Sequence, residues 1–102
     1  MATSKEYLNF ILGQLSGING ITYRQMMGEY IIYYNAKITA YICDNRLLVM
    51  PVAAAIEMMP EACYAKPYEG AKDMLLVDDV DNKEFLQALF DSLYIALPET
   101  KK

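Results

Sequence analysis

Apolar positions near the start of the chain recur with helical spacing. Four of them stand at i, i+3, i+4 and i+7 and would share one side of an α-helix: Leu8, Ile11, Leu12 and Leu15. Thr3 is followed three positions later by Glu6, which is the form of a capping box. The pattern therefore predicts a helix that begins at Thr3 and ends before Gly17 and Gly20.

From Ile21 onward the spacing becomes that of β-strands, because threonine, tyrosine and isoleucine crowd between short turn signals. Gly28 is one such signal, and Asn35-Ala36 and Asp44-Asn45 stand where two-residue hairpin loops would lie. The first loop pairs Tyr33 with Ile38, Ile31 with Ala40 and Tyr30 with Tyr41. The second pairs Ile42 with Leu47, Tyr41 with Leu48 and Ala40 with Val49. We therefore expect an antiparallel meander.

This register gives the sheet two faces. The face expected to lie under the helices carries Ile31, Tyr33, Ile38, Ala40, Ile42, Leu47 and Val49. The opposite face carries Tyr30, Ile32, Tyr34, Thr39, Tyr41, Leu48 and Met50. A slip of one residue would exchange the faces, and Ala36 does not easily adopt the positive φ that such a turn requires.

The second face is too apolar to be left in water, because monomers rarely expose large contiguous apolar patches. We expect a homodimer through the six apolar side chains of this face, which are Tyr30, Ile32, Tyr34, Tyr41, Leu48 and Met50. In the alternative, flanking loops or the helix at 51–58 cover the patch and leave a monomer.

The second half of the chain continues with a helix, a strand and a helix. Pro51 suits a helix start, and "VAAAIEMM" is rich in helix formers up to Pro60. The loop that follows is expected to be stiff, because Pro67 fixes φ and Gly70 permits a positive φ. After it, "DMLLV" predicts a strand, and the residues at 81–84 predict the cap of a last helix that Pro98 ends. That helix has a wide apolar stripe formed by Phe85, Leu86, Leu89, Phe90, Leu93, Tyr94 and Leu97.

These elements predict an α+β fold of two layers, in which the helices lie on one side of an antiparallel sheet. The expected order is α-β-β-β-α-β-β-α. With 102 residues, 55% of them apolar, the chain is expected to form one domain over residues 1–98, followed by a short charged tail at 99–102.

Charge and hydropathy exclude several classes of function. The net charge of −4, without a basic run, disfavours direct binding to nucleic acid. The start of the chain lacks the charged and apolar regions of a signal peptide, and the longest apolar run is far shorter than a membrane span. We therefore expect a cytoplasmic protein that does not bind membranes.

The sequence contains no catalytic or metal-binding constellation. It has no histidine, and its two cysteines, Cys43 and Cys63, lack CxxC spacing, so we expect free thiols rather than a zinc site or a Cys-His nucleophile. The acidic run at 77–84 has Lys83 where a calcium loop needs an oxygen ligand, and it fits a helix cap better. We expect no cofactor, no metal and no enzyme, and we expect methionines such as Met26 to fill the core.

Two stretches, "RQMMGEYIIYYN" and "PYEGAKDMLLV", followed by a last helix that ends in "ALPETKK", resemble the TfoX N-terminal domain family, which is named for bacterial regulators of natural competence. The resemblance covers nearly the whole chain and implies a fold similar to that of secretion chaperones. The resemblance implies a set of candidate binding residues, which are Arg24, Gly28, Tyr30, Tyr68, Glu69, Gly70 and Lys72. Met26 also matches the family pattern. Competence regulators of this family carry a second, C-terminal domain, which this chain does not contain.

The resemblance thus implies a stand-alone, non-enzymatic module for protein interaction or regulation in a bacterial cytoplasm. The alternative is a small-molecule binding protein or a small enzyme. In that case a pocket near Arg24, Tyr68 and Lys72 would hold an anion, because cationic side chains beside phenols suit an anionic ligand.

Overall fold

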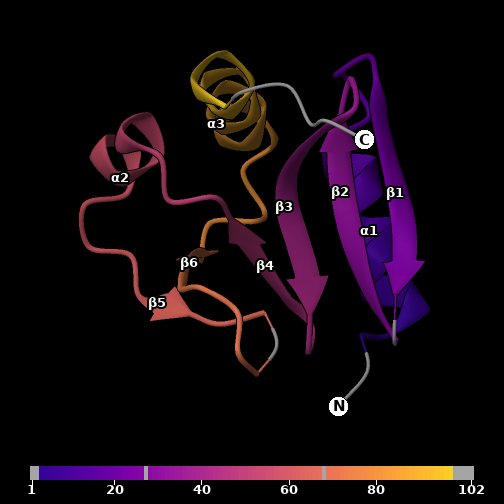
Figure 1. The fold of residues 1–102 in the computed structure, drawn as a ribbon. Helices are drawn as coiled ribbons and strands as arrows, with labels where there is room; N and C mark the ends of the chain where they lie inside the picture. Colours follow the sequence, from indigo (N-terminus) through magenta and orange to yellow (C-terminus); the bar gives the residue numbers. More distant parts are fainter. Residues whose placement is uncertain (1–2, 27, 68, 98–102) are drawn as a thin grey trace.

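Six antiparallel strands form a single sheet in the order β1-β2-β3-β4-β6-β5, and three helices pack on it (Figure 1). This computed structural model describes residues 3–26, 28–67 and 69–97. Its elements are α1 (Lys5–Gln14), β1 (Ile21–Met26), β2 (Glu29–Tyr34), β3 (Lys37–Cys43), β4 (Arg46–Val49), α2 (Ala53–Met58), β5 (Tyr64–Ala65), β6 (Met74–Val77) and α3 (Lys83–Ala96). The α+β class is confirmed, although four strands rather than three precede α2. The expected stop at Pro98 and the tail at 99–102 lie outside the described residues.

Helix α1 begins one residue later than the capping-box pattern predicts. Ser4 is the N-cap, and its Oγ accepts a hydrogen bond from the backbone N–H of Tyr7 at 3.1 Å. The Thr3 hydroxyl instead donates to Glu29 Oε1 at 2.6 Å. A local signal was therefore overridden by a contact from far along the chain.

Both predicted two-residue hairpin loops are present. Asn35, Ala36, Asp44 and Asn45 all have positive φ, between 49° and 72°, as the favoured hairpin turns require. The three pairs expected between β3 and β4 are confirmed, because Ala40, Tyr41 and Ile42 pair with Val49, Leu48 and Leu47.

The register between β2 and β3 departs from the prediction after two pairs. Tyr33 pairs with Ile38 as expected, but Ile32 then pairs with Ala40, so Thr39 is an extra residue that forms a β-bulge. The bulge is stabilised from both sides. The Thr39 hydroxyl donates to the Ile32 carbonyl at 3.2 Å, and the Thr39 carbonyl accepts the Met50 N–H at 3.1 Å. The predicted pairs of Ile31 with Ala40 and of Tyr30 with Tyr41 are therefore wrong by one residue.

The bulge exchanges the two faces of β2. Tyr30 and Ile32 are 5% and 0% exposed within the main core, and Tyr34 packs against it, whereas Ile31 lies on the opposite face beside Tyr41. Tyr33 and Ile38 are likewise on that opposite face, since Tyr33 is one residue away from Ile32 and Ile38 pairs directly with Tyr33. The expected dimer face is thus wrong for its first three members, Tyr30, Ile32 and Tyr34.

The helices cover one face of the sheet, as predicted. Ala40, Ile42, Leu47 and Val49 meet apolar side chains from all three helices; the helix members of this core are Leu8, Ile11, Ala55, Leu86, Leu89, Phe90 and Leu93. Helix α3 has the predicted cap, because the Asn82 side chain accepts the Phe85 N–H at 3.0 Å. Figure 1 shows α1 behind β1 and β2, with α3 and α2 further along the sheet. The face away from the helices is called the open face below.

Candidate functional site

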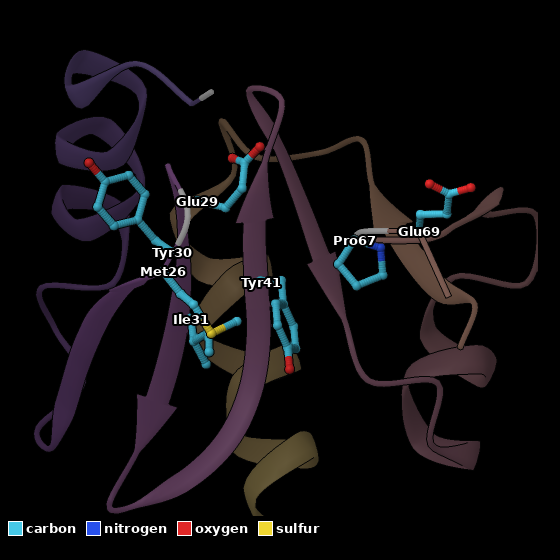
Figure 2. Close-up of a pocket in the computed structure, with 7 residues that line it drawn as sticks. All are labelled: Met26, Glu29, Tyr30, Ile31, Tyr41, Pro67 and Glu69. Carbon is cyan, nitrogen blue, oxygen red and sulfur yellow. The ribbon is translucent and has the colours of Figure 1, made fainter. Parts of the chain in front are cut away.

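The open face contains a cavity of about 610 Å³, the kind of feature that sequence periodicity does not reveal. Its lining residues are Met26, Glu29, Tyr30, Ile31, Tyr41, Pro67 and Glu69. Figure 2 shows Met26, Ile31 and Tyr41 grouped on the sheet, while Pro67 and Glu69 stand on the loop at the other side. The cavity is therefore bounded by a strand surface and by the segment between β5 and β6.

Strand pairing places the apolar part of the lining. Ile31 is directly opposite Tyr41 on β3 and opposite Arg24 on β1, so these three side chains form a row across the open face. Met26 pairs with Glu29 at the end of the β1–β2 hairpin, one row further along. Met26 is 42% exposed rather than buried, so the expectation that it fills the core is wrong. A flexible thioether at the mouth of an apolar cavity can adapt to different occupants.

Glu29 is held in place by three hydrogen bonds to one carboxylate oxygen. Oε1 accepts from the Thr3 backbone N–H at 3.2 Å, from the Thr3 hydroxyl at 2.6 Å and from the Asp44 N–H at 3.2 Å. These contacts join the segment before α1 to the β3–β4 turn. The Glu29 side chain is thus fixed at one edge of the cavity.

The loop between β5 and β6 supplies the opposite wall. Its two ends are paired through Ala65 and Met74, and an exposed ion pair joins Lys66 Nζ to Asp73 Oδ1 at 2.8 Å. Gly70 has a φ of 89°, a conformation that other residues adopt at a cost. This loop was predicted from its proline and glycine, and it carries Pro67 and Glu69 into the site.

The residues predicted from the family pattern are only partly brought together. Glu69 lines the cavity. Tyr30 also borders the cavity, but its ring points toward α1 and away from Tyr41 and Pro67 (Figure 2). This ring packs edge-to-face on Tyr23, with ring centroids 5.8 Å apart.

The other predicted residues lie beside the cavity, have a structural role or fall outside the described residues. Arg24 is exposed on the same face as Ile31, and Lys72 is exposed on the β5–β6 loop, but neither lines the cavity. Gly28 forms the β1–β2 turn with a φ of 83°, and its carbonyl accepts the Thr3 N–H at 3.2 Å, which is a structural role. Gly70 shapes the loop, and Tyr68 lies outside the described residues.

Two lining residues were missed by the sequence analysis. Glu29 was given no role and Ile31 was assigned to the core, because the bulge at Thr39 was not foreseen. Tyr41 lies on the face away from the helices, as expected. Neither Arg nor Lys is present among the described lining residues, whose charged members are Glu29 and Glu69. The site therefore suits an apolar group with a neutral or cationic neighbour better than an anion.

The buried cysteine is not poised as a nucleophile. Cys43 is 1% exposed, and burial is the main cause that raises the pKa of its thiol, against the opposing influence of Arg46. Cys63 is exposed, and neither cysteine forms a disulfide. Within the described ranges, no group of three acidic or cysteine side chains is arranged to hold a metal ion. In the same ranges, no helix has the length and apolarity needed to cross a membrane.

Comparison with known proteins gives one relative. The chain is 34% identical over 102 residues, covering 99% of its own length and 89% of the relative, to a Spirochaeta aurantia protein described as "Uncharacterized 12.7 kDa protein in trpE 5'region". The chain belongs to the family of this spirochaete protein. No family model matches the chain. No solved structure matches it either. The match therefore extends over nearly the full length of both chains.

Proposed function

We propose that this member of the spirochaete protein's family is a non-enzymatic protein-interaction module of the bacterial cytoplasm, regulatory in role and similar to the TfoX N-terminal domain. The observation that carries the proposal is the open-face cavity. It is lined by apolar side chains on a rigid sheet and bordered by two carboxylates. Such a site receives an apolar side chain of a partner whose flanking residues are basic.

The construction of the site supports a binding role. Ile31 and Tyr41 are fixed by the strand ladder, and Glu29 is fixed by Thr3 and Asp44, so little side-chain entropy is lost when a partner binds. Met26 and Pro67 border the opening on opposite sides. The volume of about 610 Å³ exceeds that of one large side chain and fits a short apolar segment.

The proposal is tested by placing a charge at the mouth of the cavity. Met26→Lys changes a 42% exposed residue and should leave the fold intact. The parent protein, carrying a tag and used as bait under crosslinking in its native cytoplasm, should retain one protein at near-equal stoichiometry. With the purified partner, Met26→Lys should weaken the equilibrium affinity at least tenfold, because the new ammonium group replaces an apolar contact and repels the partner's basic residues.

Ile95→Lys is the matched control, because Ile95 is 83% exposed on α3, away from the cavity. It receives the same charge and should bind like the parent. Absence of any stoichiometric partner, or an equal loss of affinity in both variants, would contradict the proposal.

A second candidate function is the binding of a small molecule, which the cavity volume favours. Because the charged lining residues are Glu29 and Glu69, the expected ligands are apolar amines or neutral compounds rather than the anions suggested by Arg24 and Lys72. A thermal-shift screen separates these possibilities. A saturable rise in melting temperature with amines supports this candidate, a rise confined to anions supports a site at Arg24 and Lys72, and no rise rejects both.

A further inference from the structure

The two edges of the sheet are protected to very different degrees. The β5 edge has two strand residues and is followed directly by Lys66 and Pro67, which are features that prevent pairing with another strand. The β1 edge has six residues, ITYRQM, with an uninterrupted register against β2 and without proline, lysine or a bulge. Five of its six residues are exposed. An edge of this length and regularity is a template for a further strand.

The pairing of β1 with β2 determines which backbone N–H and C=O groups of β1 point away from the sheet. The Asn35 N–H donates to the Gly20 carbonyl at 2.9 Å, so these two residues form a hydrogen-bonded pair one step before Ile21 and Tyr34. Hydrogen-bonded pairs alternate along an antiparallel ladder, so Thr22, Arg24 and Met26 are bonded to β2. The backbone groups of Ile21, Tyr23 and Gln25 therefore point away from the sheet, toward the position of a next strand.

We propose that two copies of this chain pair antiparallel through β1 and join their sheets into one. A two-fold axis perpendicular to the sheet keeps the helix-covered faces of both copies on the same side. It therefore requires that each residue pair with one whose side chain lies on the same face. With the axis at Tyr23, this residue meets itself, and Ile21 meets Gln25 of the other copy. All six outward backbone groups of each strand then find partners across the axis.

The side chains fit this register. Tyr23 is 48% exposed and stacks edge-to-face on Tyr30, so its ring stands at the boundary of the core, ready to pack on the same ring of the second copy. Arg24, the one charged residue of β1, meets Thr22 of the other copy rather than a second arginine. Moving the axis by one step to Arg24 would oppose two arginines. Of these two registers, only the axis at Tyr23 keeps the arginines apart.

The residue at the axis and the cavity are on opposite faces of β1, because Tyr23 is on the helix-covered face and Met26 is on the open face. Pairing through β1 would therefore place two open-face cavities in one continuous sheet. The dimer does not depend on the function proposed for the cavity. It replaces the face that was expected from the sequence, since Tyr30, Ile32 and Tyr34 are part of the core.

Tyr23→Lys places two ammonium groups against each other across the axis, and Tyr64→Lys is its matched control. Tyr64 is 54% exposed on β5, the other edge of the same sheet. Light scattering at micromolar concentration should give twice the chain mass of 11.6 kDa for the parent and for Tyr64→Lys, and the single-chain mass for Tyr23→Lys. Circular dichroism checks that both variants are folded. A monomeric parent, a dimeric Tyr23→Lys variant, or monomers from both variants overturns the proposal.

A second variant tests the register directly and does not depend on the loss of a contact. Residues of a hydrogen-bonded pair have Cα atoms about 5.5 Å apart, within the range of a disulfide. In a Cys63→Ser background, Tyr23→Cys should form a covalent dimer on mild oxidation, whereas Tyr64→Cys should not. Failure of Tyr23→Cys to crosslink, or equal crosslinking of both, refutes the two-fold axis at Tyr23. Protection of the β1 amides only when a different protein is added would also refute pairing with a second copy.

Discussion

Replacing Ala36 with glycine should stabilise this protein, because Ala36 has a φ of 72° in the β2–β3 turn. A left-handed conformation costs an L-residue about 1–2 kcal/mol, and glycine avoids that cost. Glycine also makes the unfolded chain more flexible, which opposes the gain by about 0.5–1 kcal/mol. The expected net gain in the free energy of unfolding is about 0.5–1 kcal/mol.

Asn45→Gly is the informative comparison, because Asn45 occupies the corresponding position of the second turn and has a φ of 56°. Its side-chain oxygen accepts the Ser4 N–H at 3.0 Å, so glycine would remove a hydrogen bond at the start of α1. Asparagine tolerates the left-handed region better than alanine does, so there is less strain to relieve. We expect this variant to lose about 1 kcal/mol, the net value of a typical hydrogen bond.

Urea denaturation followed by circular dichroism measures both changes on one scale, and a thermal melt repeats them. A gain of 1 kcal/mol corresponds to a rise in Tm of about 4–8 °C for a domain of this size, so Ala36→Gly should raise Tm by about 2–8 °C. Equal shifts of the same sign in both variants, or a lower Tm for Ala36→Gly, would show that the turn conformation is not what limits stability.

Three further predictions concern the hydrogen bonds of Glu29, the reactivity of the two thiols and the stability at alkaline pH. Glu29→Ala should lower the free energy of unfolding, measured in urea, by about 2 kcal/mol, because three donors lose their acceptor. A loss of less than about 0.5 kcal/mol would show that these hydrogen bonds do not stabilise the fold. In the folded state, alkylation followed by intact mass should show rapid labelling of exposed Cys63 and slow labelling of Cys43, whose thiol pKa is raised by burial; similar rates would contradict this. The pKa of Tyr34 is raised by burial and by its hydrogen bond to Asp91, so its contribution to stability is complete below pH 10 and is lost as pH rises through the folded value. Tyr34→Phe should therefore show a smaller loss of stability above pH 10 in denaturant titrations, and an unchanged slope would refute the assignment.

Elements that depend on local sequence were predictable. The α3 cap at Asn82 and the β3–β4 hairpin at Asp44-Asn45 follow from residues a few positions apart, and both are present as expected. The cap of α1 was displaced from Thr3 to Ser4 because Glu29, distant in sequence, binds the Thr3 hydroxyl. Long-range contacts of this kind leave no periodic signal in the chain.

The candidate site was less predictable than the fold for the same reason. Pro67 and Glu69 were visible as part of a stiff loop, since proline and glycine mark such turns locally. Ile31 was assigned to the core, because an assumed regular hairpin puts it on the same face as Ala40. The extra residue in β3 places Ile31 on the opposite face. A threonine at position 39 does not by itself predict a bulge. The cavity is therefore a property of the register rather than of any motif.

The bulge at Thr39 also indicates which changes this family tolerates. Tyr33 pairs with Ile38, and the next pair is Ile32 with Ala40, so the register of β2 against β3 shifts by one residue at Thr39. Substitutions in this hairpin alter one contact at a time, but loss or gain of a single residue in β3 would turn every side chain of β1 and β2 to the other face. Across the family, chain length in this segment should be more strictly preserved than residue identity. Gaps in alignments of its members should fall in the β5–β6 loop and stay out of β3.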